Sequence, residues 1–439
     1  MDKIAQLVTS YKDEMKEHRR LFHSHPESGW ATFWTTAKIA SFLKSYGYDL
    51  KFGDEVVCKD EMYGVANEDV LQAAYDKALK MLTKEEAEIL PKLKGGKTGL
   101  VATIDTKRPG KCVAFRFDID GVDVTESKEK SHRPTSDGFS SQNDGVTHAC
   151  GHDGHITIGL ALAKAIASNL DKFNGKFKFI FQTGEEGCRG AVGMEAAGVL
   201  KGIDYLFGAH IGFKATEDRS FICRVNKILS TTKFDVHLKG LSAHASAEPQ
   251  KGANALLAAA QMALLMHGIT RHGEGVTRVN VGVLRAGEGR NVIAPNGYLA
   301  CETRGETTEL NEFMYDKCVD IIEGVSKAFG VEYKIVRTGG TGGGDSSKEA
   351  GEFFYEAALE SPFIDNDKII KEYDFGACED FSHFMDKVQK NGGISGYAMI
   401  GTKLKAGHHN CLFDFNEDAL CSGLDVFLRI ATKINGNNK

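Results

Sequence analysis

The 439-residue sequence predicts an α/β domain that carries a second, α+β domain inserted into it. The chain is longer than one hydrophobic core usually supports, so two domains are expected. A helix-periodic apolar segment, Ile156–Leu170, is followed by a strand-like run, Gly175–Gln182, which is the alternation of an α/β fold. Over Thr231–Gly339 the segments instead follow a β-α-β-β-α-β order, typical of a compact α+β unit. The predicted domains are therefore 1–230 with 340–439, and 231–339.

The composition is that of an ordinary globular protein, with 42% hydrophobic and 26% charged residues. A formal net charge of −6, with lysine and arginine scattered among the acids, provides no basic face for nucleic acid. The N-terminus lacks an apolar signal segment, and no stretch approaches the ~18 apolar residues of a membrane span. We therefore expect a cytoplasmic protein with no membrane or nucleic-acid partner, whose ten cysteines remain thiols.

The first 50 residues are predicted to form two amphipathic helices around the turn His25–Gly29, where Pro and Gly mark the boundary. Gly47 ends the second helix. Residues 54–94 are rich in Glu, Lys and Ala with helical spacing, which predicts a helical insertion on the surface. We expect this insertion to be a solvated helix pair with no chemistry.

Two β-rich runs, Thr98–Ile104 and Cys112–Asp118, flank a Pro-Gly turn and are predicted to be neighbouring strands. The second run ends at Asp118, and Asp120 follows two residues later. Ligands of open α/β sheets bind beyond the carboxyl ends of strands, so these acids are candidates for orienting the residues of a site. Capping of the next turn is an equally good explanation for them.

The segment His148–His155, which reads HACGHDGH, is the centre of the predicted site. It places three imidazoles, one thiol and one carboxylate within eight residues, which predicts a transition-metal site. Asp153 could serve instead as the N-cap of the following helix. Capping gives no reason, however, for Cys150 and His152 at positions i and i+2.

Two further strand ends carry candidate residues. The strand Gly175–Gln182 leads into TGEEG, whose adjacent carboxylates, Glu185 and Glu186, repel each other unless solvent or a cation intervenes. Alone they would be a surface acidic pair, but beside a metal site they are expected to take part in it. The run Ile203–His210 closes on His210, which is either a structural histidine or a ligand.

The inserted domain is predicted to contain four strands and two helices, over Phe234–Leu238, Gly252–Ile269, Arg278–Leu284, Tyr298–Thr303, Glu309–Phe329 and Val331–Val336. The glycine-rich run Thr338–Gly344 lacks the Lys-Ser/Thr of a phosphate-binding loop, so we interpret it as a flexible return linker. The chain then re-enters the first domain through a helix, a strand and a closing helix, over Ser346–Leu359, Ser395–Gly401 and Glu417–Ile434.

Eight motifs extend over nearly the whole chain, in the order RRLFHSHPESGW, FRFDID, HACGHDGH, EEG, GLSAHAS, GRNVIAP, EDFS and HHNCLFDFNE. In this order they resemble the metallopeptidase family that contains aminoacylases, carboxypeptidase G, hippurate hydrolase and auxin-conjugate hydrolases. The resemblance implies a catalytic domain with a mostly parallel sheet and helices on both faces, and an inserted lid-and-dimerisation domain. TGEEG departs from the Pro-Ala pair that precedes the glutamates in many relatives, but both carboxylates are kept.

The same resemblance implies two bridged divalent ions per subunit, zinc or manganese. Cys150 matches the bridging ligand, and Glu185 matches the general base. The other implied ligands are His152, Glu186, His210 and His409. His408 is less favoured than His409, because the family pattern places the ligand immediately before the asparagine.

In the inserted domain the resemblance assigns His244 as a donor to the developing oxyanion in a partner subunit's site; a locally hydrogen-bonded loop histidine is the alternative. A substrate carboxylate would require a guanidinium fork. Arg290 and Asn291 are the favoured candidates, and Arg304 and Arg189 are less favoured. Each of these could instead form an ordinary surface or interface salt bridge.

The leading functional hypothesis is a metal-dependent amidohydrolase that cleaves an N-acyl or N-aroyl amino acid, with p-aminobenzoyl-glutamate as the leading substrate. Auxin-type conjugates, hippurate and N-acetyl amino acids are the alternatives within this class. A homodimer through the inserted domain is the default assembly, and a heteromer with a related second subunit is the alternative. A non-catalytic, metal-binding interaction subunit is the competing hypothesis, but the complete ligand set and the intact glutamate pair argue against it.

Overall fold

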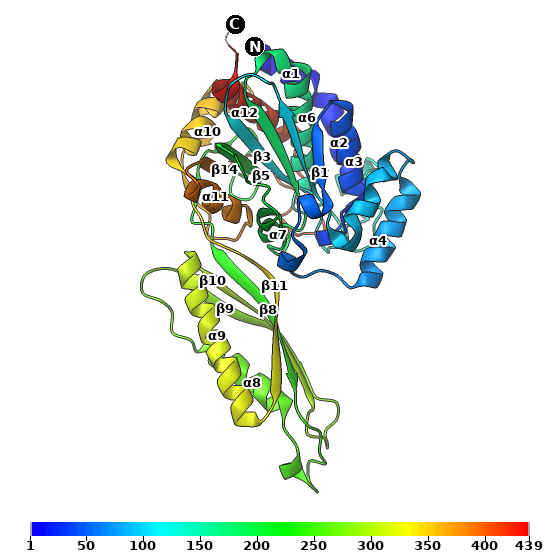
Figure 1. Ribbon diagram of the computed structural model, residues 1–439, viewed down its shortest axis with the longest axis vertical. Helices are drawn as coiled ribbons and strands as arrows, with labels where there is room; N and C mark the ends of the chain where they lie inside the picture. The colour runs from blue at the N-terminus through cyan, green and yellow to red at the C-terminus, as the bar shows by residue number, and fades with distance from the viewer. Residues whose placement is uncertain (1, 438–439) are drawn as a thin grey trace. The chain divides into compact units, whose positions relative to one another are not determined.

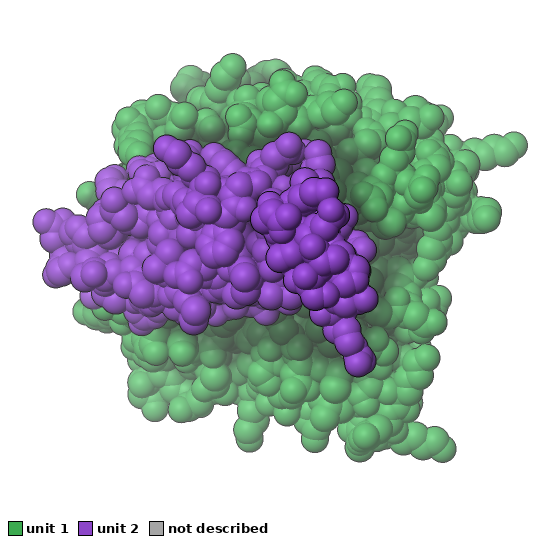
Figure 2. Space-filling model, turned by 90° about the horizontal axis from the view of Figure 1, so that it is seen from below, with its two compact units in different colours: residues 1–226, 345–375, 380–439 green, residues 227–344, 376–379 purple. Residues whose placement is uncertain are grey.

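The computed structural model describes residues 2–437, which form two compact units (Figure 2). Unit 1 comprises Met1–Asn226, Asp345–Phe375 and Asp380–Lys439, and unit 2 comprises Lys227–Gly344 and Gly376–Glu379. Each unit has a hydrophobic core of its own. No helix within residues 2–437 is both long and apolar enough to cross a bilayer.

Unit 1 is built on an eight-stranded sheet with the order β1-β2-β4-β3-β5-β14-β6-β12. The strands are β1 Asp49–Phe52, β2 Leu100–Asp105, β3 Cys112–Asp118, β4 Lys176–Gln182, β5 Tyr205–Ile211, β6 Phe221–Ile222, β12 Ile369–Ile370 and β14 Ile394–Ile400. The four central strands β4, β3, β5 and β14 are parallel, whereas β1 and β2 add to the edge in antiparallel fashion. The predicted α/β fold with a mostly parallel sheet is confirmed.

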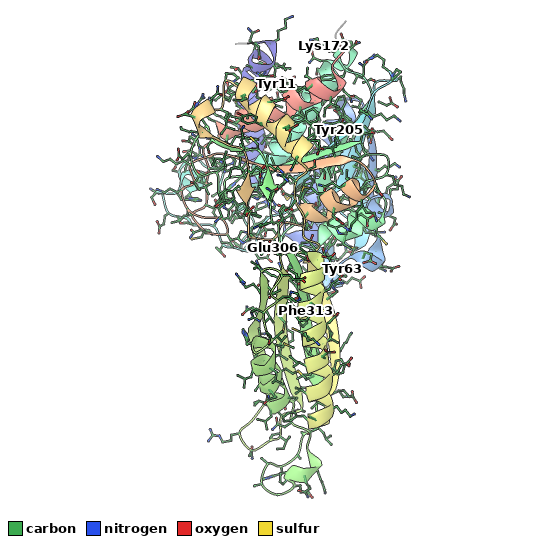
Figure 3. The ribbon with its side chains drawn as sticks, turned by 90° about the vertical axis from the view of Figure 1, so that its left-hand side faces the viewer. Tyr11, Tyr63, Lys172, Tyr205, Glu306 and Phe313 are labelled. Carbon is green, nitrogen blue, oxygen red and sulfur yellow. The ribbon has the colours of Figure 1, made fainter. Side chains whose placement is uncertain are left out.

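Helices cover both faces of this sheet (Figure 1). The helices of unit 1 are α1 Lys3–Ser10, α2 Lys12–Ser24, α3 Phe33–Ser45, α4 Glu68–Met81, α5 Arg133–Ser136, α6 His152–Ser168, α7 Gly190–Ala196, α10 Lys348–Glu360, α11 Phe381–Lys390 and α12 Ala419–Asn435. Successive residues of a strand point to opposite faces. Accordingly Phe207 of β5 packs on Phe354 of α10, while Gly208 faces Phe381 of α11. Tyr205, at the start of the same strand, meets Phe353 of α10 edge-on (Figure 3).

The prediction that the first two β-rich runs are neighbours is wrong. β4 lies between β2 and β3, antiparallel to the first and parallel to the second. The connection from β2 to β3 crosses the start of β4, where Gly110 and Gly175 come so close that a Cβ on Gly110 would lie 2.5 Å from the Gly175 nitrogen. Because the two backbones can approach so closely, the chain passes the start of β4 and forms β3 on its far side. β2 and β3 therefore do not form a hairpin.

Several helices also differ from prediction. The first predicted helix is divided at Tyr11 into α1 and α2, so three helices rather than two occupy the first 50 residues. Residues 54–94 contain α4 and the 3₁₀ helix η4, Glu86–Gly96. Helix α11, which begins at Phe381 within the EDFS motif, is an element that was not predicted from the sequence; it packs against β5 and β14.

Unit 2 contains a four-stranded antiparallel sheet with the order β11-β8-β10-β9. Its elements are β8 Ser230–Lys239, α8 Ala255–His267, β9 Thr277–Ala286, β10 Asn296–Gly305, α9 Thr308–Phe329 and β11 Glu332–Thr341, in the predicted β-α-β-β-α-β order. The two helices pack against the sheet and bury Met262 and Met314. Phe313 of α9 is labelled in Figure 3. Its ring meets that of His272 edge-on, with centroids 5.0 Å apart.

The glycine-rich run is only partly a linker. Strand β11 continues to Thr341, where Gly339 and Gly340 pair with Lys233 and Thr232 of β8. A Cβ on Gly340 would lie 2.9 Å from the carbonyl oxygen of Thr231, so the missing side chain allows the two backbones to pair. Gly339 and Gly340 therefore belong to the sheet, which corrects the prediction of a flexible segment over the whole of Thr338–Gly344.

Candidate metal centre

The HACGHDGH segment makes a sharp turn into α6 at Gly151. Gly151 occupies the N-cap position with φ +88°, in the left-handed region that favours glycine. The turn places Cys150 before the helix and His152 in its first turn, and both side chains are buried. Asp153 is therefore not the N-cap, which corrects that alternative.

Two sets of three potential ligands share Cys150. One set consists of Cys150, His152 and His210, and the other of Cys150, Glu186 and His409; within each set the ligand atoms lie within 4.8 Å of one another. The Cys150 sulfur is 3.5 Å from His210 Nε2, and His409 Nε2 is 3.3 Å from Glu186 Oε1. Two ligands that are each about 2.0–2.3 Å from one ion lie roughly 3–4 Å from each other. The donors thus fit a pair of neighbouring cations, and Cys150 is common to both sets.

Backbone carbonyls orient two of the imidazoles. His152 Nδ1 donates to the carbonyl of Asp120 at 2.8 Å, which turns its Nε2 toward Glu185 and Glu186 at 3.8 and 3.9 Å. That buried Nε2 has no hydrogen-bond partner within the described chain. His210 Nδ1 donates to its neighbour's carbonyl, Ile211 O, at 2.8 Å. Metal-binding histidines commonly donate their second N–H in this way, so the unpartnered Nε2 of His152 supports a cation at this point.

Asp120 holds the glutamate pair in place. Its carboxylate accepts the backbone N–H groups of Glu185 at 3.0 Å and Glu186 at 3.1 Å. Burial, together with the charges of Glu186 and Asp118, raises the pKa of Asp120 well above its usual range. The strand-end acid therefore orients the TGEEG loop, one of the two roles left open by the sequence.

Asp118 orients the third imidazole of the motif. His155 Nδ1 donates to Asp118 at 2.5 Å, and its Nε2 accepts the backbone N–H of Ile211 at 2.9 Å. Arg116 donates to the other carboxylate oxygen of Asp118 at 2.7 Å. Both ring nitrogens of His155 are thus engaged, and the residue links α6 to the end of β5 beside His210.

The two adjacent histidines near the C-terminus behave differently. His408 Nε2 donates to the carbonyl of Ile211 at 3.1 Å, whereas His409 faces Glu186. His409 has φ +62°, an uncommon left-handed backbone for a non-glycine residue. The strained turn directs the His409 ring, rather than that of His408, toward the ligand cluster.

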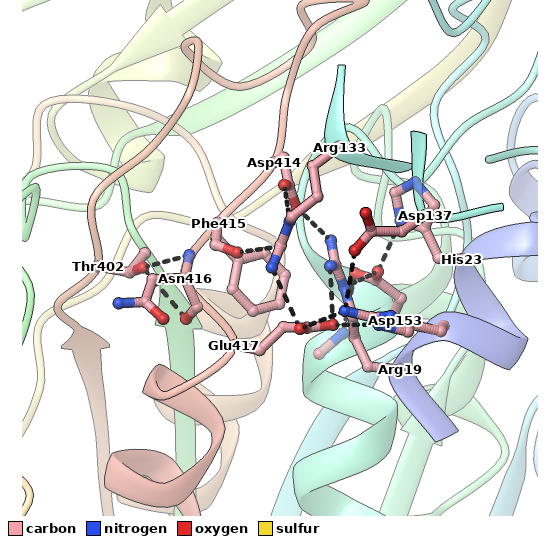
Figure 4. A network of polar contacts seen from close by, with 12 residues as sticks. Arg19, His23, Arg133, Asp137, Asp153, Thr402, Asp414, Phe415, Asn416 and Glu417 are labelled. Atoms are coloured by element: carbon pink, nitrogen blue, oxygen red, sulfur yellow. Dashed lines mark hydrogen bonds and ion pairs between the residues drawn. The ribbon is translucent and has the colours of Figure 1, made fainter. Parts of the chain in front are cut away.

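A buried charge network supports the first turn of α6 (Figure 4). Arg19 of α2 has no exposed side-chain surface and contacts Asp153 at 2.8 Å, Asp414 at 2.9 Å and Glu417 at 3.4 Å. His23 bridges Asp153 at 2.8 Å and Glu126 at 2.9 Å. Burial opposes charge on His23, but these two hydrogen bonds raise its pKa. Sequence reasoning missed this network; the only signal was the polar run within RRLFHSHPESGW.

The remaining predicted site residues lie elsewhere in the chain. Arg189 follows the glutamate pair in unit 1, and its Nη1 donates to the carbonyl of Gly64 at 3.4 Å. Arg304, in unit 2, pairs with Glu302 on the same strand at 3.1 Å. These two arginines therefore already contact groups of their own unit.

Unit 2 brings His244 beside the GRNV loop. Ala245 N donates to the carbonyl of Asn291 at 3.0 Å, and His244 forms an isolated bridge with Val292. His244 Nδ1 accepts the backbone N–H of Ala247 at 3.2 Å, so the local hydrogen bonding expected for a loop histidine is present. Arg290 is exposed in the same loop.

The family model described as peptidase family M20/M25/M40 matches residues 114–433. An A-subunit homolog of p-aminobenzoyl-glutamate hydrolase from Haemophilus influenzae is 42% identical, covering 96% of this chain and 98% of the relative. An indole-3-acetyl-aspartic acid hydrolase from Enterobacter agglomerans is 38% identical over 97% of both chains. The crystal structure of an aminobenzoyl-glutamate utilization protein from Klebsiella pneumoniae superposes with a TM-score of 0.84 at 32% identity, covering 98% of both chains.

Proposed function

The chain belongs to peptidase family M20/M25/M40, and on this premise we propose that it is a metal-dependent amidohydrolase that cleaves p-aminobenzoyl-glutamate to p-aminobenzoate and glutamate. The observation that carries the proposal is the pair of ligand sets that share Cys150 beside Glu185. The name of the Haemophilus relative supports the choice of substrate.

Five side chains would hold two divalent ions: Cys150, His152, Glu186, His210 and His409. Thiolate and imidazole suit zinc, while the carboxylate also admits manganese. When bound, such ions supply Lewis acidity at the amide carbonyl and lower the pKa of water toward neutrality. The unpartnered Nε2 of His152 and the short spacing between donors are the features of this chain that fit them.

Glu185 is proposed as the general base. It belongs to neither of the two sets that share Cys150, although it forms other potential sets with His152 and Glu186 and with Glu379 and Asp380. Its carboxylate lies 3.8 Å from His152 Nε2. Asp120 fixes its backbone, which holds the side chain at the edge of the cluster. Glu185 takes a proton from the attacking water as the oxygen adds to the amide carbon, then returns that proton to the nitrogen as the carbon–nitrogen bond breaks.

Residues of unit 2 are proposed to act on the substrate. His244 would donate to the carbonyl oxygen as negative charge develops there, in the site of a partner subunit. Arg290 and Asn291 would bind the glutamate carboxylates, and the contact between Ala245 and Asn291 supports a shared role with His244. Arg304 and Arg189 are the less favoured candidates, because each already contacts a neighbour.

A homodimer through unit 2 is proposed as the assembly. Strand β9 is an edge of its sheet, and α8 exposes Leu257 by 50% and Leu264 by 72%. An edge strand beside an apolar helix can pair with its own copy about a two-fold axis. Because the Haemophilus relative is named as a homolog of one hydrolase subunit, a heteromer with a related second subunit is the alternative.

A reducing, cytoplasmic compartment is proposed on chemical grounds. All ten cysteines are free thiols, including the buried Cys150 that would bind the ions. Oxidation of that thiol would remove the shared ligand.

The deciding experiment combines metal analysis with a substrate panel. Elemental analysis of the purified protein should give two ions per chain. Assays with added zinc or manganese should then show faster amide hydrolysis of p-aminobenzoyl-glutamate, which releases glutamate, than of hippurate, which releases glycine, or of acetyl-glutamate. Preferred turnover of indole-3-acetyl-aspartate would favour the second candidate, which rests on the 38% identity to that hydrolase. A protein that binds no metal would overturn both.

A further inference from the structure

A cavity of about 590 Å³ opens in unit 1 beside the turn His25–Ala31 and helix α4. Asn143, Asp144, Val146 and Arg189 are also part of its wall, and all of its lining residues belong to unit 1. Small-molecule sites usually measure roughly 300–1,000 Å³, so the space can hold part of a small ligand. None of the metal ligands proposed above lines it.

Helix α4 presents a regular stripe to this cavity. The stripe runs through Val70, Ala73, Ala74, Lys77 and Met81, at the spacing of three and four residues that places side chains on one helix face. The two alanines leave room, while Val70 is 55% and Met81 is 41% exposed. A solvated helix pair without chemistry does not account for two large apolar side chains that face an open space.

A different face of α4 secures the helix to the rest of unit 1. Leu71 is buried, and Tyr75 packs edge-on against Phe33 of α3 with ring centroids 5.7 Å apart. Ala74, within the stripe, also packs against the core of unit 1, whereas Val70 and Met81 do not. These two exposed apolar side chains are therefore not needed for anchoring α4 and remain available for a ligand.

The opposite wall is aromatic. Trp30 and Trp34 both line the cavity, and they are the only two tryptophans in the sequence. His25 stacks on Trp34 with centroids 4.7 Å apart and an interplanar angle of 23°. Trp30 is fixed by its Nε1, which donates to the carbonyl of Tyr63 at 2.7 Å. Trp30 and Trp34 are only 2% and 5% exposed, so these fixed rings give the cavity a small, rigid aromatic surface, which favours a flat ligand.

The same wall is bonded to the loop that carries the proposed base. Thr183, which begins TGEEG, donates its hydroxyl to the carbonyl of Gly29 at 2.8 Å. Gly29 has φ +50°, and a Cβ there would lie 3.4 Å from Arg189 Nη1. Gly121, directly after Asp120, donates its N–H to the carbonyl of Glu27 at 2.7 Å. Both segments that hold the glutamate pair thus contact the turn that forms the cavity.

The lining of the cavity carries ionisable groups of both signs. Lys77 contacts Asn143, and Arg189 is a second cation of the wall, but Glu27, Asp123 and Asp144 also line it. With both signs present, the lining selects for an apolar ring more than for the two carboxylates of a glutamate.

We propose that this cavity binds the aromatic ring of the substrate's acyl group and so sets the preference for aroyl over small acyl substrates. The inference rests on the amidohydrolase function proposed above and deepens it. The scissile amide would lie at the TGEEG end of the cavity, and the amino-acid part would extend away from α4.

A binding titration tests the site without catalysis. The probe is p-nitrobenzoate, an aromatic acid that quenches tryptophan, added to the metal-loaded full chain. Because both tryptophans line the cavity, saturable quenching is expected, and acetate should give none. Ala73→Phe fills the cavity from an exposed helix position. It should raise the Kd for p-nitrobenzoate at least about tenfold, the loss of affinity expected when a ring of this size is no longer buried. Leu79→Phe adds the same ring on α4 outside the lining and should leave the titration unchanged.

A kinetic comparison tests the consequence for the reaction. Ala73→Phe should lower kcat/KM for p-aminobenzoyl-glutamate about tenfold but change kcat/KM for acetyl-glutamate by less than about twofold. Ala74→Leu, a smaller change on the same face, should show the same selectivity with a lesser loss. Equal losses on both substrates, or equal effects of Ala73→Phe and Leu79→Phe, would overturn the proposal.

The two proposals fail in different ways. If the wild-type protein hydrolyses neither substrate, the proposed function fails, whereas the quenching titration still decides whether the cavity binds an aromatic ring. If hydrolysis occurs but p-nitrobenzoate gives no saturable quenching, the cavity proposal alone fails.

Discussion

The ring of His408 stacks on that of Phe213, with centroids 4.0 Å apart and an interplanar angle of 3°. Together with its hydrogen bond to Ile211, this stack fixes His408 against the end of β5. Its neighbour His409 is 51% exposed and faces Glu186. Two adjacent imidazoles therefore have separate roles, one in packing and one in the ligand cluster.

Replacing His409 by glycine should remove one ion. Glycine suits the φ of +62° at this position, so His409→Gly deletes the imidazole without backbone strain. We expect the metal content to fall from two ions toward one per chain, and turnover to fall at least about a hundredfold. His408→Phe, which preserves the stack on Phe213, is the matched control and should retain both ions. Equal metal loss in the two variants would remove His409 from the ligand set.

Glu185→Gln should separate catalysis from metal binding. The amide keeps the shape of the side chain but cannot accept the proton of the attacking water. We expect kcat to fall by about 10²–10⁴-fold, with two ions still bound by elemental analysis. Unchanged kcat would exclude Glu185 as the base, and loss of metal would make it a ligand.

Arg19→Met should destabilise the protein strongly. The substitution leaves Asp153, Asp414 and Glu417 buried without their shared cation, which should lower the free energy of unfolding by about 3–5 kcal/mol. Arg20→Met is the control, because Arg20 is 35% exposed and also pairs with Glu417. Its effect should not exceed about 1 kcal/mol, the upper end for surface ion pairs. Urea unfolding of both variants gives the comparison, and similar losses would contradict it.

The stability of the turn that begins the cavity should depend on pH. Burial raises the pKa of Glu27 to about 7, although the backbone N–H groups of Thr35 and Trp34 oppose this shift. Because the folded-state pKa lies above the unfolded value, the stabilisation from Glu27 is present below the ordinary glutamate pKa of 4.5 and is lost as the pH rises through about 7.

We expect the free energy of unfolding of the wild type, relative to Glu27→Gln, to fall by about 2–3 kcal/mol from pH 5 to pH 8. Denaturant unfolding of both proteins across that range gives this difference. A difference that stays constant with pH would show that Glu27 ionises normally.

Leu264→Asp should disrupt the proposed dimer. Leu264 is the most exposed large hydrophobic side chain of α8, and a carboxylate there would have to be buried at a two-fold interface. Sedimentation should show dimers for the wild type and monomers for the variant. Leu79→Asp, on α4 of unit 1, introduces the same charge at another exposed leucine and should remain dimeric. A wild type that is already monomeric would contradict the assembly.

The local sequence predicted the elements that carry the site better than the way they are joined. The run before Asp118 and the helix after Cys150 follow simple periodicity, so their existence and type are confirmed. The position of β4 between β2 and β3 depends on the crossing of two glycine backbones, Gly110 and Gly175, which no periodicity reveals. The extension of β11 through Gly339 could not be predicted either, because glycine is more typical of a linker than of a strand interior. It is the pairing with β8 that makes this residue part of the strand.

The ligand cluster shows the same division. Residue types and spacing pointed to Cys150 and His152, but the choice of His409 over His408 came from family resemblance alone. The structure adds contacts that favour it, namely the stack on Phe213 and the left-handed turn at His409. The hydrogen-bond partners of Arg19 and His23 could not be predicted, since they lie more than a hundred residues away in the sequence.

The order of the sheet has a consequence for synthesis on the ribosome. β5 ends at Ile211, but its neighbour β14 begins only at Ile394, after the whole of unit 2. While unit 2 is being made, one edge of the central sheet remains open, and open edges of this kind invite pairing with other chains. His409 emerges later still, so the potential set Cys150, His152 and His210 is synthesised well before the second set is complete. A ribosome that stalls within unit 2 would therefore expose a chain with an unprotected strand, which makes it a natural target for chaperones.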